Sequence, residues 1–195
     1  MVSLEDDDQL SSLDDLEQLG SSSQMVEVEQ AKTKYSLVMS ACVERLKEMD
    51  ARRMPVYLDR VNAMVRKAWA VPAHGHALAY SLCNVLRNNG GLDILMDNCV
   101  SDDGDLQLSS ARLLEQCLTQ ENRSYVVERG LDKVVSLACG CTEPTASVDQ
   151  SRVGTGLLEH LFQHNEGTCS DVVKLGGSVT TLQFHLNASN IIVKS

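Results

Sequence analysis

Aromatic residues and prolines are scarce in this 195-residue sequence: aromatics make up 4% of it, and there are three prolines. Strands depend on aromatic and β-branched side chains, whereas the apolar residues here are mainly leucine, valine and alanine, which suit packed helices. No run approaches the roughly 18 apolar residues that span a bilayer. The first residues also lack the basic and apolar regions of a signal peptide. We therefore expect an all-α, cytoplasmic protein with no membrane span.

Basic residues are missing from the first 30 positions, which hold nine acidic residues. The remaining sequence has 18 acidic and 17 basic residues, so the net charge of -10 is a local property. Without a basic patch, nucleic acid and anionic membranes are not expected partners. Residues 1–24 are predicted to be an acidic, disordered tail. Its leucines Leu10, Leu13 and Leu16 leave open a helix that forms transiently or with a partner.

The motifs of common enzyme classes are also absent. The chain has no Gly-x-Ser-x-Gly, Walker or Gly-x-Gly-x-x-Gly pattern. Gly154-Thr-Gly156 matches such loops only partly and lies in a helical repeat, where small residues indicate close packing. We therefore predict no catalytic residues.

Metal and disulfide patterns are not recognisable either. His160 and His164 lie four residues apart on an expected helix, but a zinc site needs further ligands in a recognisable pattern, so no metal is predicted. Seven cysteines are an odd number without a framework spacing. Cys83, Cys99 and Cys117 lie in apolar stretches, which predicts buried, reduced thiols.

Helical periodicity is strong from residue 26 onward. Apolar residues recur at steps of three and four through 26–49, 56–69 and 76–87, with Pro55 and Pro72 at the breaks. On the first of these helices, the expected buried stripe is Val28, Ala31, Tyr35, Val38, Cys42, Leu46 and Met49.

Two sequence blocks repeat in phase. Gly91-Leu-Asp recurs as Gly130-Leu-Asp after 39 residues, and Leu113-Leu-Glu recurs as Leu157-Leu-Glu after 44 residues. Gly177 begins a degraded third copy. Helical repeats of about 40–47 residues are typical of armadillo and HEAT proteins. We predict part of a right-handed armadillo-type α-solenoid over 25–183 and an irregular tail over 184–195.

The repeat also suggests a binding surface. Equivalent positions of stacked repeats align on one ridge, so Gln116 and His160 are expected side by side, with Arg123 and Trp69 close to them. An indole, a guanidinium group and imidazoles can stack a heteroaromatic ring and hold a phosphate. From the pattern alone, packing of Trp69 at a helix end and solvation of the other side chains is the simpler interpretation.

Several motifs together resemble the N-terminal armadillo region of the SARM family, the NAD hydrolases that contain sterile-alpha and TIR motifs. The motifs are Trp69-Ala-Val-Pro-Ala-His-Gly-His, Asn89-Gly-Gly-Leu-Asp-Ile-Leu, Ala111-Arg-Leu-Leu-Glu-Gln with Glu121-Asn-Arg, and Gly156-Leu-Leu-Glu-His-Leu-Phe-Gln-His. They keep the order and spacing of the family over roughly 28–183. The sequence is similar to an invertebrate member that has been truncated.

The resemblance implies a regulatory role. In that family the armadillo region is an autoinhibitory sensor: bound NAD keeps the TIR domains silent, and nicotinamide mononucleotide (NMN) displaces NAD and releases them. The TIR domains then cleave NAD, which drives axon degeneration and innate immune signalling. The expected allosteric ligand is NAD or NMN, with no cofactor. The implied partners are the family's own TIR and SAM domains, in a homo-oligomer of the full-length protein.

The resemblance also implies a ligand site. Trp69 would stack the nicotinamide ring and Arg123 would contact phosphate. The other matching positions are His76 (Arg in vertebrate members), Glu115, Gln116, His160 and Gln163 (Lys in vertebrate members). Since the catalytic TIR domain has no counterpart in this sequence, no enzymatic activity is expected from it. The alternative is an armadillo protein-interaction scaffold or adaptor without nucleotide binding.

Overall fold

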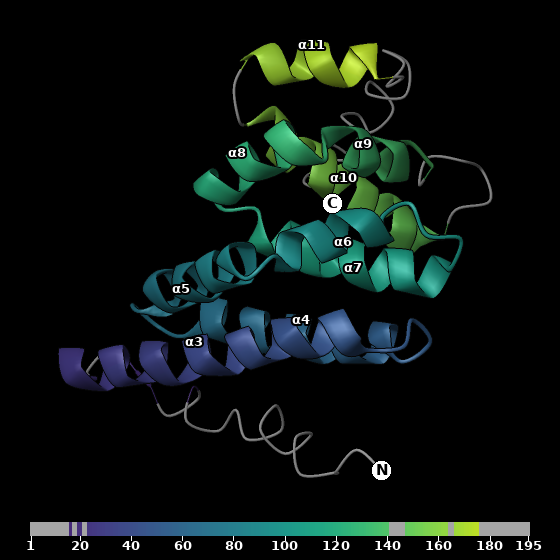
Figure 1. The fold of residues 1–195 in the computed structure, drawn as a ribbon. Coiled ribbons are helices and arrows are strands. Elements are labelled where there is room, and N and C mark those ends of the chain that lie inside the picture. The colour runs from purple at the N-terminus through teal and green to yellow at the C-terminus, as the bar shows by residue number, and fades with distance from the viewer. Residues whose placement is uncertain (1–15, 17–18, 21–22, 141–146, 164–165, 176–195) are drawn as a thin grey trace. The chain divides into compact units, whose positions relative to one another are not determined.

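A computed structural model describes residues 16, 19–20, 23–140, 147–163 and 166–175 (Figure 1). Over these residues all regular structure is helical, which confirms the predicted all-α fold. The helices are α3 (Met25–Glu48), α4 (Met54–Ala70), α5 (Gly75–Asn88), α6 (Gly91–Asn98), α7 (Gly104–Cys117), α8 (Gln120–Arg129), α9 (Leu131–Gly140), α10 (Val148–Phe162) and α11 (Glu166–Lys174). The expected tail over 184–195, most of the tail over 1–24 and the repeat copy at Gly177 lie outside the described residues. The right-handed superhelix remains a prediction.

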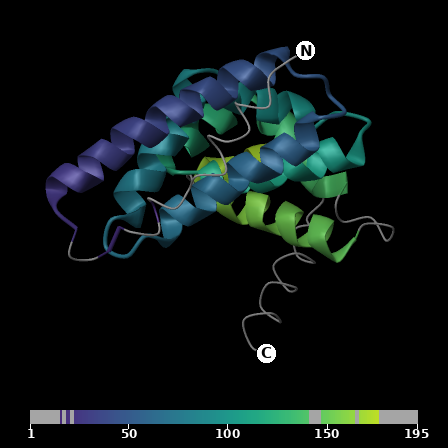
Figure 2. The same ribbon diagram turned by 90° about the horizontal axis from the view of Figure 1, so that it is seen from below.

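The chain divides into two compact units, residues 1–94 and 95–195. In the first unit α4 runs back alongside α3, and α5 packs against both helices (Figure 2). Their shared core is aliphatic and includes Met39, Leu58, Val61, Leu78 and Leu82, each no more than 2% exposed.

Local signals explain where the helices of the first unit begin. Gln24 and Glu27 form a reciprocal capping box at the start of α3, which satisfies backbone N–H groups that the first turn leaves unpaired. Pro55 lies within the first turn of α4, where its missing N–H costs nothing. The expected break at Pro55 is therefore the start of a helix, one residue beyond Met54.

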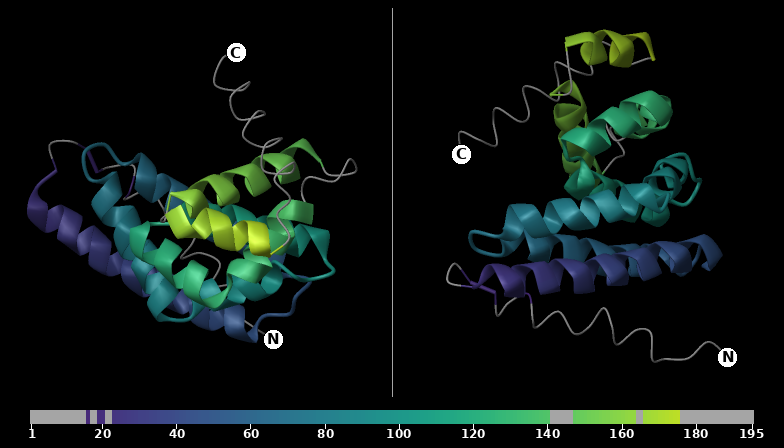
Figure 3. Two further views of the ribbon diagram at one scale, coloured as in Figure 1. Left: turned by 90° about the horizontal axis from the view of Figure 1, so that it is seen from above. Right: turned by 60° about the vertical axis from the view of Figure 1, so that its left-hand side comes forward.

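The second unit is organised around α10, which packs against α7, α8, α9 and α11 (Figure 3). Asp103 caps α7 by accepting from the backbone N–H groups of Asp105 and Leu106, and Ser147 with Gln150 forms a capping box on α10. A β-carbon on Gly130, just before α9, would overlap the Met96 sulfur. The repeated glycine at this position thus reflects a close approach.

The predicted apolar stripe of α3 is largely correct. Val28, Tyr35, Cys42 and Leu46 are buried, but Ala31, Val38 and Met49 are only half-buried. Met39 and Val43, which were not in the predicted stripe, are buried. Helix α3 contacts both α4 and α5, so it buries a wider face than the single predicted stripe.

The cysteine prediction is confirmed for Cys83, Cys99 and Cys117, which are buried and not in disulfide bonds, as is Cys42. Burial raises the pKa of the Cys42 thiol above 9.0, even though a hydrogen bond with Tyr57 and the charge of Arg45 oppose the shift. Among the described helices, none is long and apolar enough to cross a lipid bilayer.

Candidate functional site

A tight, strained turn joins α4 to α5 in the first unit. Gly75 N–H donates to the Val71 carbonyl and His74 N–H to the Pro72 carbonyl, both at 2.8 Å. Ala73, between them, has φ of 63°, in the left-handed region that side chains with a β-carbon disfavour. Such strain tends to be retained where a structure positions functional groups.

The turn brings three rings together. Trp69, near the end of α4, lies edge-on to His76 at 5.9 Å between ring centroids and edge-on to Tyr80 at 6.1 Å. His76 and Tyr80, four residues apart on α5, stack at 4.3 Å with planes 23° apart. Trp69 and Tyr80 are half-buried and His76 is exposed, so the cluster presents ring surface to solvent. We call Trp69, His76 and Tyr80 the aromatic cluster.

Gly75 makes this approach possible. A β-carbon at position 75 would overlap the backbone carbonyl oxygen of Trp69, which cannot move aside as a flexible side chain could. The residue after the turn must therefore be glycine for α5 to start beside the end of α4 and place His76 next to Trp69.

A second cluster lies within the second unit, between α7 and α10. Arg152, Gly156 and His160 follow one another at intervals of four along α10, which puts them on one face of the helix. Glu115 of α7 packs its carboxylate against Gly156 and experiences the charges of Arg152 and His160 on either side. We call Glu115, Arg152, Gly156 and His160 the carboxylate cluster.

The carboxylate of Glu115 is partly desolvated. Burial raises its pKa above 4.5, and the neighbouring Glu159 adds to the rise, while Arg152 and His160 oppose it. His160 Nδ1 lies 2.9 Å from the carbonyl oxygen of Gly156. Because a carbonyl oxygen can only accept, Nδ1 is the donor in this contact, and Nε2 is the ring nitrogen left for other partners.

Arg123 on α8 has an incompletely satisfied guanidinium group. Thr119 caps α8, and the buried Asn122 donates at 2.8 Å to the Cys117 carbonyl, which anchors the start of the helix. The half-buried Arg123 donates from Nη1 to the Leu118 carbonyl at 3.4 Å, whereas its buried Nε has no partner among the described residues. A guanidinium group in this state can bind an anion.

The predicted site residues thus fall into local groups. Within the first unit the rings of Trp69 and His76 lie against each other, and within the second the charge of His160 lowers the pKa of Glu115. Gln116 is half-buried on α7, next to Glu115, and Gln163 is exposed at the C-cap of α10. The expectation that Gln116 and His160 stand side by side stays a prediction.

Sequence reasoning missed Tyr80, Arg152 and Gly156 as members of these groups. Their signal was present, since Tyr80 lies four residues after His76, and Arg152 and Gly156 precede His160 at the same interval. Gly154-Thr-Gly156 was correctly interpreted as close packing, which Gly156 now shows.

Metal ligands do not gather in the part of the chain that the structure describes, where no group of three or more His, Cys, Asp or Glu side chains could hold an ion. His160 lies in the carboxylate cluster described above. His164, its suggested partner in a metal site, lies outside the described residues.

No protein-family model matches the chain. It is similar to NAD(+) hydrolase sarm1 of Drosophila melanogaster, at 53% identity over 176 residues, or 85% of this chain and 13% of that protein. It is also 34% identical over 119 residues to NAD(+) hydrolase SARM1 of Danio rerio, covering 61% of this chain and 16% of the relative. For NAD(+) hydrolase tir-1 of Caenorhabditis elegans the identity is 23% over 146 residues, or 73% and 15%.

The likeness covers most of this chain but a small part of each relative, between 13% and 16% of its length. The chain belongs to the SARM family, as a stretch homologous to part of its NAD(+) hydrolases.

Proposed function

We propose that this chain is a regulatory, nucleotide-sensing region of a SARM-type NAD hydrolase, and that it binds NAD or NMN as an allosteric ligand. The observation that carries the proposal is the aromatic cluster at the strained turn, in a chain whose relatives are named for NAD hydrolysis. The turn holds Ala73 in a strained conformation and places Gly75 against the Trp69 carbonyl, and backbone strain of this kind clusters at functional sites.

The chemistry of the side chains fits a nicotinamide nucleotide. Trp69 offers an aromatic face to the nicotinamide ring, and such ring contacts contribute about 0.5–1.5 kcal/mol beyond area burial. Arg123 offers a guanidinium group with an unpartnered Nε to a phosphate. His160 offers its Nε2 atom to a polar group of the ligand, and Gln116 and Gln163 add amides at the positions of the family's site.

The hydrolytic activity named for the relatives is, in this proposal, carried by sequence beyond the matched stretch. The chain corresponds to 13% of the Drosophila protein, and its candidate residues suit binding better than bond cleavage. The TIR and SAM domains of the full-length protein would be its partners, with ligand exchange controlling their release.

Calorimetric titration of the chain with NMN and with NAD tests the proposal. We expect binding that Trp69→Ala and Arg123→Ala each weaken by about tenfold, on the scale of one lost ring contact or charge-assisted hydrogen bond. Arg112→Ala is the matched control for loss of one guanidinium group, because Arg112 pairs with Asp149 at 3.1 Å and is not one of the proposed ligand residues. Absence of heat at millimolar ligand, or equal loss with Arg112→Ala, would refute nucleotide sensing.

The second candidate is a protein-interaction scaffold without nucleotide binding. It is favoured by a groove of about 410 Å³ in the second unit, between the start of α9 and α11, where Leu175 is 48% exposed. A scaffold predicts no response to either nucleotide and loss of protein partners on Leu175→Asp. The same titration therefore separates the two functions.

A further inference from the structure

Arg152 is a charged residue of the carboxylate cluster that has no role in the function proposed above. It lies on α10, four residues before Gly156 and eight before His160, so the three residues share one helix face. Its side chain is exposed, and among the described residues it forms no hydrogen bond or ion pair. Arg112 differs, because it is paired with Asp149. The guanidinium group of Arg152 therefore keeps its donors for a ligand.

The guanidinium group of Arg152 lies within the electric field of Glu115. Burial raises the pKa of Glu115, and Arg152 is the largest of the charges that oppose this rise. The Glu115 carboxylate itself lies against Gly156 of α10. Arg152 is thus close to the contact between α7 and α10, although it forms no ion pair with Glu115.

Arg123 and Arg152 lie on opposite sides of the Glu115 carboxylate. Helices α7 and α10 run in the same direction, because the two side-chain contacts between them advance together toward both C-termini. On α10, Arg152 lies one turn before Gly156, which meets Glu115. Arg123 donates to the carbonyl of Leu118, which follows Glu115 by three residues at the end of α7. The carboxylate is therefore flanked by two guanidinium groups.

The charge of a dinucleotide requires more than one of these groups. NAD brings two phosphates to a binding surface, whereas NMN brings one, and a guanidinium group holds one phosphate through two parallel hydrogen bonds. Among the proposed ligand residues of the second unit, Arg123 is the permanent cation and Glu115 carries the opposite charge. A second phosphate would therefore meet no net positive charge unless Arg152 joins the site.

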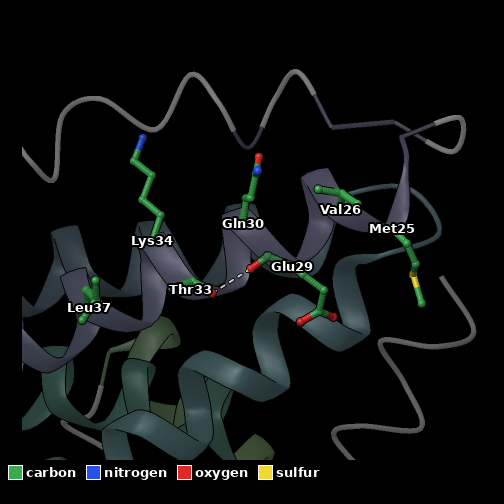
Figure 4. A pocket seen from close by; sticks show the side chains of 7 residues that line it. All are labelled: Met25, Val26, Glu29, Gln30, Thr33, Lys34 and Leu37. Carbon is green, nitrogen blue, oxygen red and sulfur yellow. Dashed lines mark hydrogen bonds between the residues drawn. The ribbon is translucent and has the colours of Figure 1, made fainter.

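The groove along the outer face of α3 offers no comparable place for a phosphate. It encloses about 690 Å³, and the apolar Met25, Val26 and Leu37 line it together with the oppositely charged Glu29 and Lys34 (Figure 4). Figure 4 shows Glu29 and Lys34 projecting in different directions from α3. An apolar surface with balanced charge suits an apolar partner better than an anion.

The groove between the start of α9 and α11 contains two cations that already have partners. Lys174 pairs with Asp171 at 3.0 Å, and Arg129 lies over the Tyr125 ring at 4.8 Å from its centroid. A phosphate there would compete with these contacts, whereas at Arg152 it would displace no ion pair among the described residues.

We propose that Arg152 binds the second phosphate of a dinucleotide and so makes the site prefer NAD to NMN. This role for Arg152 rests on the proposed function, since it adds a residue to the same ligand site. Arg123 contacts the phosphate that both nucleotides share, and Arg152 contacts the phosphate that belongs to the adenosine half of NAD. Arg152 is then a specificity-determining residue on which NMN binding does not depend.

Calorimetric titration of the full chain with NAD and with NMN tests this role. Arg152→Gln keeps a polar side chain without the charge, and it should weaken NAD binding by about tenfold to a hundredfold, on the scale of one lost charge-assisted contact. NMN binding should stay unchanged. Arg152→Lys keeps the charge but not the planar fork, so its NAD affinity should lie between the two. Arg123→Ala should weaken both nucleotides, and Arg112→Gln, the matched control, should weaken neither.

Two results would overturn this role and leave nucleotide sensing intact. Equal weakening of NAD and NMN by Arg152→Gln would mean that Arg152 acts on the shared part of the site, for example through Glu115. Unchanged binding of both nucleotides would mean that Arg152 is only a solvated side chain. If the native chain binds neither nucleotide, nucleotide sensing itself is refuted, and the role of Arg152 falls with it.

Competition experiments separate the phosphate from the adenine ring. Inorganic pyrophosphate should displace NAD from the native chain, and about tenfold more should be needed with Arg152→Gln. Adenosine should compete equally well in both chains. If Arg152→Gln weakens adenosine competition instead, Arg152 stacks on the adenine ring, and the phosphate contact is refuted. Because Arg152 is exposed, the variant should keep its helix content by circular dichroism.

Discussion

Gly156 on α10 faces the carboxylate of Glu115 on α7 so closely that a β-carbon at position 156 would overlap Glu115 Oε1. The contact sets where the carboxylate lies, one helical turn from both Arg152 and His160 on α10. Since the overlapping atom is the far end of a flexible side chain, a larger residue at position 156 would move the carboxylate and leave the helices in place.

Gly156→Ala should therefore separate binding from stability. Alanine favours the interior of a helix by about 1 kcal/mol over glycine, which offsets the cost of moving Glu115. We expect little change in Tm but several-fold weaker nucleotide binding, measured by thermal melting and calorimetry. Gly104→Ala is the control, because a β-carbon at position 104 would meet no atom within 4 Å. A large drop in Tm for Gly156→Ala alone would mean that the helices themselves had separated.

Glu115 should make stability depend on pH. Because burial raises its pKa above 4.5, the folded chain retains a proton at pH values where the unfolded chain has lost it. The stability from this proton is present at low pH and is lost as pH rises through the raised pKa. Glu115→Gln cannot titrate, so it lacks this pH dependence. The free energy of unfolding of the native chain, measured in urea, should therefore fall relative to that of Glu115→Gln as pH rises from 4.5.

A pH-independent difference between the native chain and Glu115→Gln would contradict this account. Arg152→Ala provides a second test, because the charge of Arg152 lowers the pKa of Glu115 and its removal should move the transition to higher pH.

Ala73→Gly should stabilise the chain. A left-handed alanine costs about 1–2 kcal/mol, and glycine gives back about 0.5–1 kcal/mol through its greater freedom in the unfolded state. The expected net gain is about 0.5 kcal/mol by urea denaturation. Ala73→Val, with a branched β-carbon, should destabilise the chain more than a surface substitution does. Stabilisation by valine would show that φ of 63° is not held by the turn.

Tyr80→Ala should weaken nucleotide binding through His76. Tyr80 stacks on His76 at 4.3 Å and supports the edge of Trp69, so its loss frees both rings. An aromatic contact of about 0.5–1.5 kcal/mol corresponds to a loss of roughly two- to tenfold in affinity. Trp69 is the only tryptophan of the sequence, so its fluorescence reports ligand stacking directly. Tyr80→Phe keeps the ring and should retain the quenching, whereas equal loss in both variants would implicate the hydroxyl group instead.

Helix positions were readable from the sequence because their signals are local. Each of these signals acts within one or two helical turns. They are the apolar residues at steps of three and four, the prolines Pro55 and Pro72 near helix starts and turns, and the repeated Gly-Leu-Asp blocks. The largest error on α3, Val38 in place of Met39, arose because a stripe one residue wide cannot describe contact with α4 and α5 together.

The candidate site was only partly readable. Trp69, His76, Glu115, Arg123 and His160 were named through family resemblance and the alignment of repeats. Tyr80 and Arg152 were missed, although each lies at a helical interval from a named residue, because that interval shows a shared face but not whether the face meets another element.

The sequence by itself determined that the described residues form helices, that Cys83, Cys99 and Cys117 are buried and that the repeats have the armadillo length, because periodicity and composition act along the chain. Only the tertiary structure decided that Ala73 is held in a left-handed turn, that Gly75 meets the Trp69 carbonyl and that Glu115 lies partly desolvated against Gly156. These features depend on which surfaces come within van der Waals distance once the helices pack, and the sequence pattern does not give that distance.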